Sequence, residues 1–306
     1  MLRFILLRLI QSFFTLIGVT FISFLIIKLA PADYFAQLKL NPQISPETIE
    51  TLRRQYGLDQ PILIQYLRWL KSALMFDLGL SFQYHAPVLD LIRERIGNTL
   101  LLTVPSALLS WFMAVPLGLL AGMKDGSLVD KFIRAFSYIF MSFPSFFLAF
   151  LLLLFFSKSS FFQLGGWQSL IVGIITITLI STAGLVRLMR SATIEILNSP
   201  MVLLLKSKGL RGWTFTRHII KNAMNPFTTL IGYEIAGLLS GAALVEIIVG
   251  WPGLGSLMLD AVLATDLFLV MGGLYIGTIM LLIGNLVADL LLAYIDPRVR
   301  EKEILK

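Results

Sequence analysis

Six long apolar runs constrain the fold of this 306-residue chain more than any other feature. A helix that crosses a bilayer needs about 20 consecutive apolar residues and satisfies all of its backbone polar groups internally. The runs have roughly that length, and the short alternating segments typical of a membrane barrel are absent. We therefore predict an all-α membrane protein with six transmembrane helices. The runs cover residues 9–29, 98–122, 135–157, 168–189, 227–250 and 268–294.

The composition agrees with a membrane protein. Only 14% of the residues are charged, whereas soluble domains carry about 25%. The absence of cysteine excludes disulfides, thiol catalysis and Cys-ligated metals. The net charge of +7 could indicate nucleic-acid binding. We favour the ordinary excess of basic residues in cytoplasmic loops, and so expect no nucleic-acid partner.

The distribution of Lys and Arg sets the expected orientation. With the N-terminus inside, the internal segments collect 16 of the 25 basic residues. The two short external loops hold only Lys158 between them, so an N-in, C-in topology is predicted. The first run follows Arg3 and Arg8, as in a signal peptide. Because it is longer than the 7–15 apolar residues of such a peptide, we expect a retained span.

The external segment of residues 30–97 is predicted to be helical rather than a flexible linker. Ser45-Pro46-Glu47 is a typical helix start, and Gly57 is placed to end that helix. A second helix is expected to begin near Pro61. Two roles remain open for this segment: a cap packed on the membrane surface, or a docking surface for an external partner.

Sequence motifs of enzymes are missing. There is no G-x-x-x-x-G-K-[ST] loop, no H-E-x-x-H and no G-x-S-x-G, and the only two histidines, His85 and His218, are far apart. We predict that the chain is not an enzyme and binds neither a metal nor a cofactor.

A polar loop over residues 190–226 interrupts the apolar runs. Seven basic residues lie between Arg187 and Lys221, against the single acid Glu195. Residues 201–208 and 214–225 can form two helices, with Gly209 as a left-handed turn between them and Pro226 as the stop. Such a hairpin could be a knob that binds a cytoplasmic partner. Alternatively, it could lie on anionic lipid headgroups.

Several motifs together resemble those of the binding-protein-dependent ABC importer permeases, in the dipeptide, oligopeptide and nickel branch. The resemblance covers nearly the whole chain in order, which suggests one permease domain over residues 1–306. It departs from the family pattern at Met201, Leu204, Leu205 and Ser207, where the family usually has Tyr, Thr, Ala and Ala. The matching motifs are Lys208-Gly209-Leu210, Arg217-His218, Asn222-Ala223, Pro226, Gly241 to Glu246, Trp251 to Gly255, and Asp296-Pro297-Arg298.

The resemblance implies that the polar loop is a coupling helix seated in a groove of a separate ATPase. The implied partners are a second permease, two cytoplasmic ABC ATPases that use ATP and Mg, and an external substrate-binding protein. Short peptides are the expected substrate, with nickel or another small solute as the alternative and a self-sufficient secondary transporter as a weaker one. The expected coupling residues are apolar anchors Val202, Leu203, Leu205 and Leu210, the cations Lys206, Lys208 and Arg211, the turn Gly209, and His218.

Ionisable residues inside membrane spans usually face protein or water. Glu246 precedes the turn at Trp251, and we favour a structural hydrogen bond for it over substrate contact. Glu234 and Asp289, with Asn285 one turn from Asp289, could line the translocation path or pair between helices.

Overall fold

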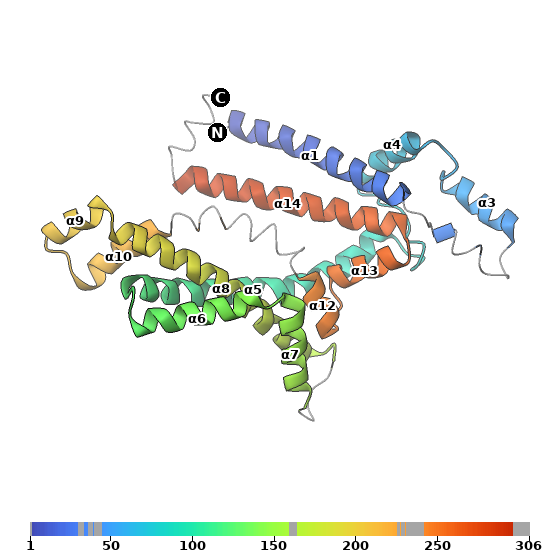
Figure 1. The fold of residues 1–306 in the computed structure, drawn as a ribbon. Coiled ribbons are helices and arrows are strands. Elements are labelled where there is room, and N and C mark those ends of the chain that lie inside the picture. The colour runs from blue at the N-terminus through green and yellow to red at the C-terminus, as the bar shows by residue number, and fades with distance from the viewer. Residues whose placement is uncertain are drawn as a thin grey trace. The chain divides into compact units, whose positions relative to one another are not determined.

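The computed structural model describes residues 2–29, 34–35, 39, 45–158, 164–224, 227, 230 and 242–295. Their regular structure is helical, apart from one isolated bridge between Leu80 and Pro87. Figure 1 labels the helices in chain order. They are α1 (Leu2–Leu29), α3 (Pro46–Gln55), α4 (Ile62–Ala73), α5 (Val88–Met123), α6 (Leu128–Ser142), α7 (Ser145–Ser157), α8 (Trp167–Leu197), α9 (Pro200–Ser207), α10 (Gly212–Ala223), α12 (Ala243–Val249), α13 (Leu254–Leu263) and α14 (Leu267–Ile295).

Four helices in the described part of the chain are long and apolar enough to cross a membrane, namely α1, α5, α8 and α14. The number rises to six if two broken helix pairs, α6 with α7 and α12 with α13, each count as one span. The all-α class is therefore confirmed, whereas six spans are an upper count. Within the fifth predicted span, residues 231–241 lie outside the described residues.

The third apolar run is not the continuous helix predicted for residues 135–157. α6 ends at Ser142, α7 begins at Ser145, and the two axes differ by 100°. Pro144 at the break has an extended ψ of 139° and precedes the first residue of α7. A proline cannot donate the backbone hydrogen bond that would continue α6, which explains the break.

The chain divides into two compact units. The first contains residues 1–98 and 252–283, and the second contains residues 99–251 and 284–306. The predicted single domain is not tested by this division, because α5 and α14 each contribute to both units.

The first unit contains the helical segment predicted between the first two spans. Ser45 Oγ accepts a hydrogen bond from the Thr48 amide at 3.2 Å, and Pro46 occupies the first turn of α3, as expected. Gly57 has a φ of +66° just after α3, and α4 begins after Pro61. The Tyr66 hydroxyl on α4 donates to the Ile17 carbonyl of α1 at 3.0 Å. These contacts confirm the helix boundaries and hold the segment on α1.

In the second unit, α5 and α8 approach closely at two glycines of α5. A Cβ at Gly118 would lie 2.5 Å from Met189 Cβ, and one at Gly122 would lie 2.6 Å from Thr193 Cβ. Small residues four positions apart let membrane helices pack backbone to backbone. This contact fixes α8, the helix that leads into the polar hairpin.

Candidate functional site

The turn between α9 and α10 is built by glycine. Gly209 has a φ of +73°, its amide donates to the Lys206 carbonyl at 3.0 Å, and the Leu210 amide donates to the Leu205 carbonyl at 3.1 Å. These two bonds form the Schellman motif, which ends a helix with a left-handed residue. Gly212 also has a positive φ, of +61°, where α10 begins. The helix, glycine turn and helix predicted from the sequence are therefore present.

One face of this α9–α10 hairpin packs against its own chain. Val202 is only 2% exposed, and Ile219 and Ala223 on α10 are fully buried. Both α9 and α10 contact α8, and Figure 1 shows the hairpin at the end of α8. Val202 thus anchors the hairpin to the protein itself. Its side chain is covered within this chain, and its role as an anchor for a partner stays a prediction.

The opposite face carries apolar side chains without cover in this structure. Leu203 is 75% exposed, Leu204 is 57% exposed, and Trp213 at the start of α10 is 72% exposed. An exposed apolar group of this kind is typical of a surface that a partner protein or the lipid covers. We define Leu203, Leu204 and Trp213 as the apolar tip. The sequence prediction included Leu203 and missed Trp213, which lies beyond the turn.

The other predicted coupling residues belong to the same hairpin and differ in exposure. Leu205 and Leu210 are partly buried. The cations and His218 are exposed, and Gly209 lies in the turn itself. The hairpin therefore exposes both apolar and basic side chains, a combination found in protein interfaces. The exposed members of this set are Lys206, Lys208, Arg211 and His218.

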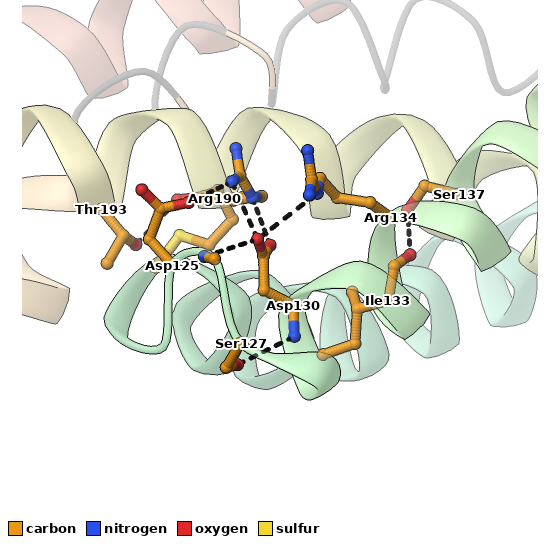
Figure 2. Close-up of polar contacts among 10 residues, drawn as sticks. Asp125, Ser127, Asp130, Ile133, Arg134, Ser137, Arg190 and Thr193 are labelled. Carbon is orange, nitrogen blue, oxygen red and sulfur yellow. Dashed lines mark hydrogen bonds and ion pairs between the residues drawn. The ribbon is translucent and has the colours of Figure 1, made fainter.

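An ionic cluster around one buried aspartate lies where α6 meets α8, near the C-terminal end of α8 (Figure 2). Asp130 is fully buried and accepts hydrogen bonds from Arg190 Nε at 2.6 Å and from the same guanidinium's Nη2 at 3.1 Å. Arg134 Nε lies 3.3 Å from Asp130 Oδ2. Arg190 Nη2 also donates to Asp125 at 2.5 Å. Two arginines thus balance two aspartates, and the bidentate contact fixes the position of α6 against α8.

Backbone groups complete the shell of Asp130. The Gly126 amide donates to Asp130 Oδ2 at 3.0 Å, and Ser127 Oγ accepts from the Asp130 amide at 3.3 Å (Figure 2). Ser127 is therefore the N-cap of α6, with a carboxylate in the first turn. The same aspartate organises the start of α6 and binds α8.

This cluster changes the interpretation of the polar loop. α8 continues to Leu197, eight residues beyond the predicted end, so Arg187 and Arg190 belong to a helix and not to a loop. Arg187 is exposed, but Arg190 is occupied by the two aspartates. Sequence reasoning missed this pairing because Asp130 and Arg190 are 60 residues apart.

The polar residues predicted within the spans occupy different environments. Glu246 on α12 is fully buried, and its Oε1 accepts a hydrogen bond from Thr99 Oγ1 on α5 at 2.6 Å. That contact favours the structural role for Glu246. Asn285 is exposed and Asp289 is partly buried on α14. Glu234 lies outside the described residues, so its role stays a prediction.

Within the described ranges, no group of three or more His, Cys, Asp or Glu side chains is placed to hold a metal ion.

Comparison with known families gives two matches that together cover most of the chain. The family described as "Binding-protein-dependent transport system inner membrane component" matches residues 114–301. The family described as "Binding-prot-dependent transport system membrane comp, N-term" matches residues 1–103. The α9–α10 hairpin and the ionic cluster both lie within the first of these matches.

Individual relatives are similar over almost their full length. The oligopeptide transport system permease protein AppB of Bacillus subtilis is 32% identical, with 98% of this chain and 99% of the relative covered. The metal-staphylopine import system permease protein CntB of Staphylococcus aureus is 31% identical, with the same coverage. The glutathione transport system permease protein GsiC of Escherichia coli is 31% identical over 99% of this chain and 100% of the relative.

Proposed function

Because the chain belongs to the family of binding-protein-dependent transport system inner membrane components, we propose that it forms half of the path of an importer for short peptides. The chain is a multi-pass permease subunit of the bacterial inner membrane. In the proposed assembly it pairs with a second permease, two cytoplasmic ATPases and an external binding protein. ATP and Mg are used by the ATPases, and this chain binds no cofactor of its own.

We place six spans in the membrane with both termini inside. The four long apolar helices supply four spans, and the α6–α7 and α12–α13 pairs supply the other two. This arrangement puts the α9–α10 hairpin on the cytoplasmic side and the α3–α4 segment outside. The excess of basic residues in the inner segments supports it.

The single observation that carries the proposal is the exposed apolar tip on a hairpin that also exposes Lys206, Lys208 and Arg211. Leu203, Leu204 and Trp213 would enter an apolar groove on the ATPase, while Lys206 and Lys208 orient the contact. Since the hairpin is fixed to α8 by buried side chains, a pull on the tip would move α8. The Asp130–Arg190 contact would then carry the movement to α6.

The peptide substrate rests on the relatives, whose names include oligopeptide and glutathione transport. The metal-staphylopine relative keeps a metal-chelate or nickel substrate as the alternative. A chelate would be recognised through its organic part, so it needs no metal ligands from the permease.

The test is copurification followed by uptake. The chain, its candidate ATPases and its binding protein are expressed together, and the complex is reconstituted into vesicles. We expect ATP-dependent accumulation of labelled di- or tripeptides, with no accumulation under an ion gradient alone. Uptake driven by an ion gradient without any ATPase would contradict the proposal. Uptake of a nickel chelate but no peptide would select the alternative substrate.

A further inference from the structure

A cavity of about 320 Å³ lies within the first unit, beside the α3–α4 segment. Its walls come from α1, the end of α3, one face of α4, the loop after α4 and the start of α14. Aromatic rings of Phe24, Tyr56, Trp69 and Phe268 form much of the surface. Small-molecule sites occupy roughly 300–1,000 Å³, so this cavity suits a ligand of about dipeptide size.

The face that α4 turns toward the cavity carries polar groups. Gln65, Arg68, Trp69 and Ser72 all line it, and their spacing of three, four and seven residues places them on one side of the helix. At such positions a helix that only packs against a core carries purely apolar side chains. The polar groups on this face therefore need an explanation other than packing.

Two of these side chains have buried polar atoms that lack partners. Gln65 Nε2 donates to the carbonyls of Leu58 at 3.1 Å and of Gln60 at 2.6 Å, which fixes the orientation of the amide. Its Oε1 has no donor from the part of the chain that the structure describes. Trp69 is 5% exposed, and its Nε1–H has no acceptor among the described residues. An unpaired buried donor and acceptor are costly, so a ligand or water should satisfy both.

Opposite charges also line the cavity. The Arg68 guanidinium donates to Gln60 Oε1 at 2.9 Å and retains further N–H groups for other acceptors. It lies against Gly57, where φ is +66° and a Cβ would clash with Arg68 Nη1. The Asp77 carboxylate also lines the cavity, is exposed and accepts from the Gly79 amide at 3.1 Å. A zwitterion could meet both charges.

We propose that this cavity binds a short zwitterionic peptide. A peptide group carries one N–H donor and one carbonyl acceptor, and these complement Gln65 Oε1 and Trp69 Nε1–H. The terminal carboxylate meets Arg68, and the terminal ammonium meets Asp77. The chemistry of binding stands on the cavity itself, whereas its place on the transport path rests on the proposed function.

Calorimetric titration of the full-length protein in lipid nanodiscs with alanyl-alanine tests the proposal. The wild type should bind the dipeptide and should bind free alanine, which has no peptide group, at least about tenfold more weakly. Trp69→Phe keeps a ring but removes the N–H, and should weaken dipeptide binding about tenfold. Trp167→Phe is the matched control, because Trp167 is exposed on α8 and does not line the cavity.

A second variant protects the test against misfolding. Arg68→Gln changes an exposed side chain and should weaken alanyl-alanine binding by a similar factor while leaving the thermal midpoint unchanged. Absence of dipeptide binding to the wild type would overturn the proposal, because water alone would then occupy the cavity. Equal affinity of folded Trp69→Phe and wild type would overturn it as well.

The uptake assay separates this inference from the proposed function. If Trp69→Phe changes neither peptide uptake nor dipeptide binding, the proposed permease function stands and the cavity is not a peptide-binding site. If dipeptide binding depends on Trp69 but the reconstituted complex takes up no peptide, the cavity is a peptide site and the proposed import function is wrong.

Discussion

Arg190 on α8 holds Asp130 on α6 through two hydrogen bonds, of 2.6 Å from Nε and 3.1 Å from Nη2. The carboxylate is fully buried, and the guanidinium is 18% exposed. Removing one partner of such a pair leaves a buried charge without compensation. The pair thus connects the helix that bears the hairpin to the neighbouring α6.

Replacing Asp130 by Asn should therefore destabilise the protein strongly. Arg190 would lose its bidentate partner, and we expect a decrease of about 3 kcal/mol in the free energy of unfolding. Asp125→Asn is the control: Asp125 is more than half exposed, so its loss should cost less than about 1 kcal/mol. Thermal unfolding of the two purified variants measures both effects. Equal stability of the variants would contradict the assigned role of Asp130.

Gly118→Ala should disturb the contact between α5 and α8. The added Cβ would lie 2.5 Å from Met189 Cβ and 2.8 Å from the Val186 carbonyl oxygen, so the helices must separate. We expect a loss of about 1–3 kcal/mol of stability, typical of overpacking. Gly184→Ala on α8 is the control, because a Cβ there meets nothing within 4 Å. A stabilised Gly118→Ala protein would show that the close approach is absent.

Gly209→Val should distort the hairpin turn through the backbone alone. A Cβ at Gly209 has open space, but φ is +73°, a conformation that a β-branched residue adopts at a cost of about 1–2 kcal/mol. Gly209→Asn is the matched control, since asparagine tolerates left-handed backbone. Copurification with the ATPase should fall for Val and persist for Asn. Equal loss of copurification with Val and with Asn would indicate that the added side chain itself disturbs the contact, and not the backbone conformation of the turn.

The apolar tip should govern binding to the ATPase. Leu203→Asp places a charge at the centre of the contact and should weaken association at least about tenfold, measured by biolayer interferometry with the purified ATPase. Leu63→Asp, the same exchange at an exposed leucine of α4, should leave association unchanged.

Val202→Ala tests how α9 contributes to the stability of the protein. The Val202 side chain is covered by the protein itself. The substitution should therefore lower the free energy of unfolding by about 1–2 kcal/mol, which is measured as a lower thermal midpoint. ATPase affinity of the folded protein should be retained. Lost affinity without lost stability would return Val202 to the partner-binding face.

Local rules made parts of the fold predictable. The N-cap at Ser45 and the turns at Gly57 and Gly209 depend on a few adjacent residues, and all three are found where the sequence predicts them. The all-α class follows from the length and composition of the apolar runs. Such features need no knowledge of distant contacts.

Features set by tertiary contacts were not predictable in the same way. Pro105 and Pro116 lie inside the continuous α5, whereas Pro144 separates α6 from α7. Residue type alone therefore does not tell which proline ends a helix. The close approach at Gly118 and the Asp130–Arg190 pair likewise require knowing which helices are neighbours.

The candidate site likewise combines features that adjacent residues set with features that tertiary contacts set. Periodicity places Val202 and Leu203 in one apolar helix but cannot tell which of them is covered within the chain, so both were predicted as partner anchors. Trp213 was missed because it follows the turn and belongs to no apolar run. A tryptophan directly after a glycine, Gly212-Trp213, in a polar stretch is the sequence signal that could have indicated it.

The hairpin's shape is set by Gly209 and Gly212, which have no side chains, and by Val202, Ile219 and Ala223, which face inward. None of these five residues belongs to the outer surface formed by Leu203, Leu204 and Trp213. The outer residues can therefore be substituted without altering the residues that shape the hairpin, so shape and surface chemistry can be varied independently.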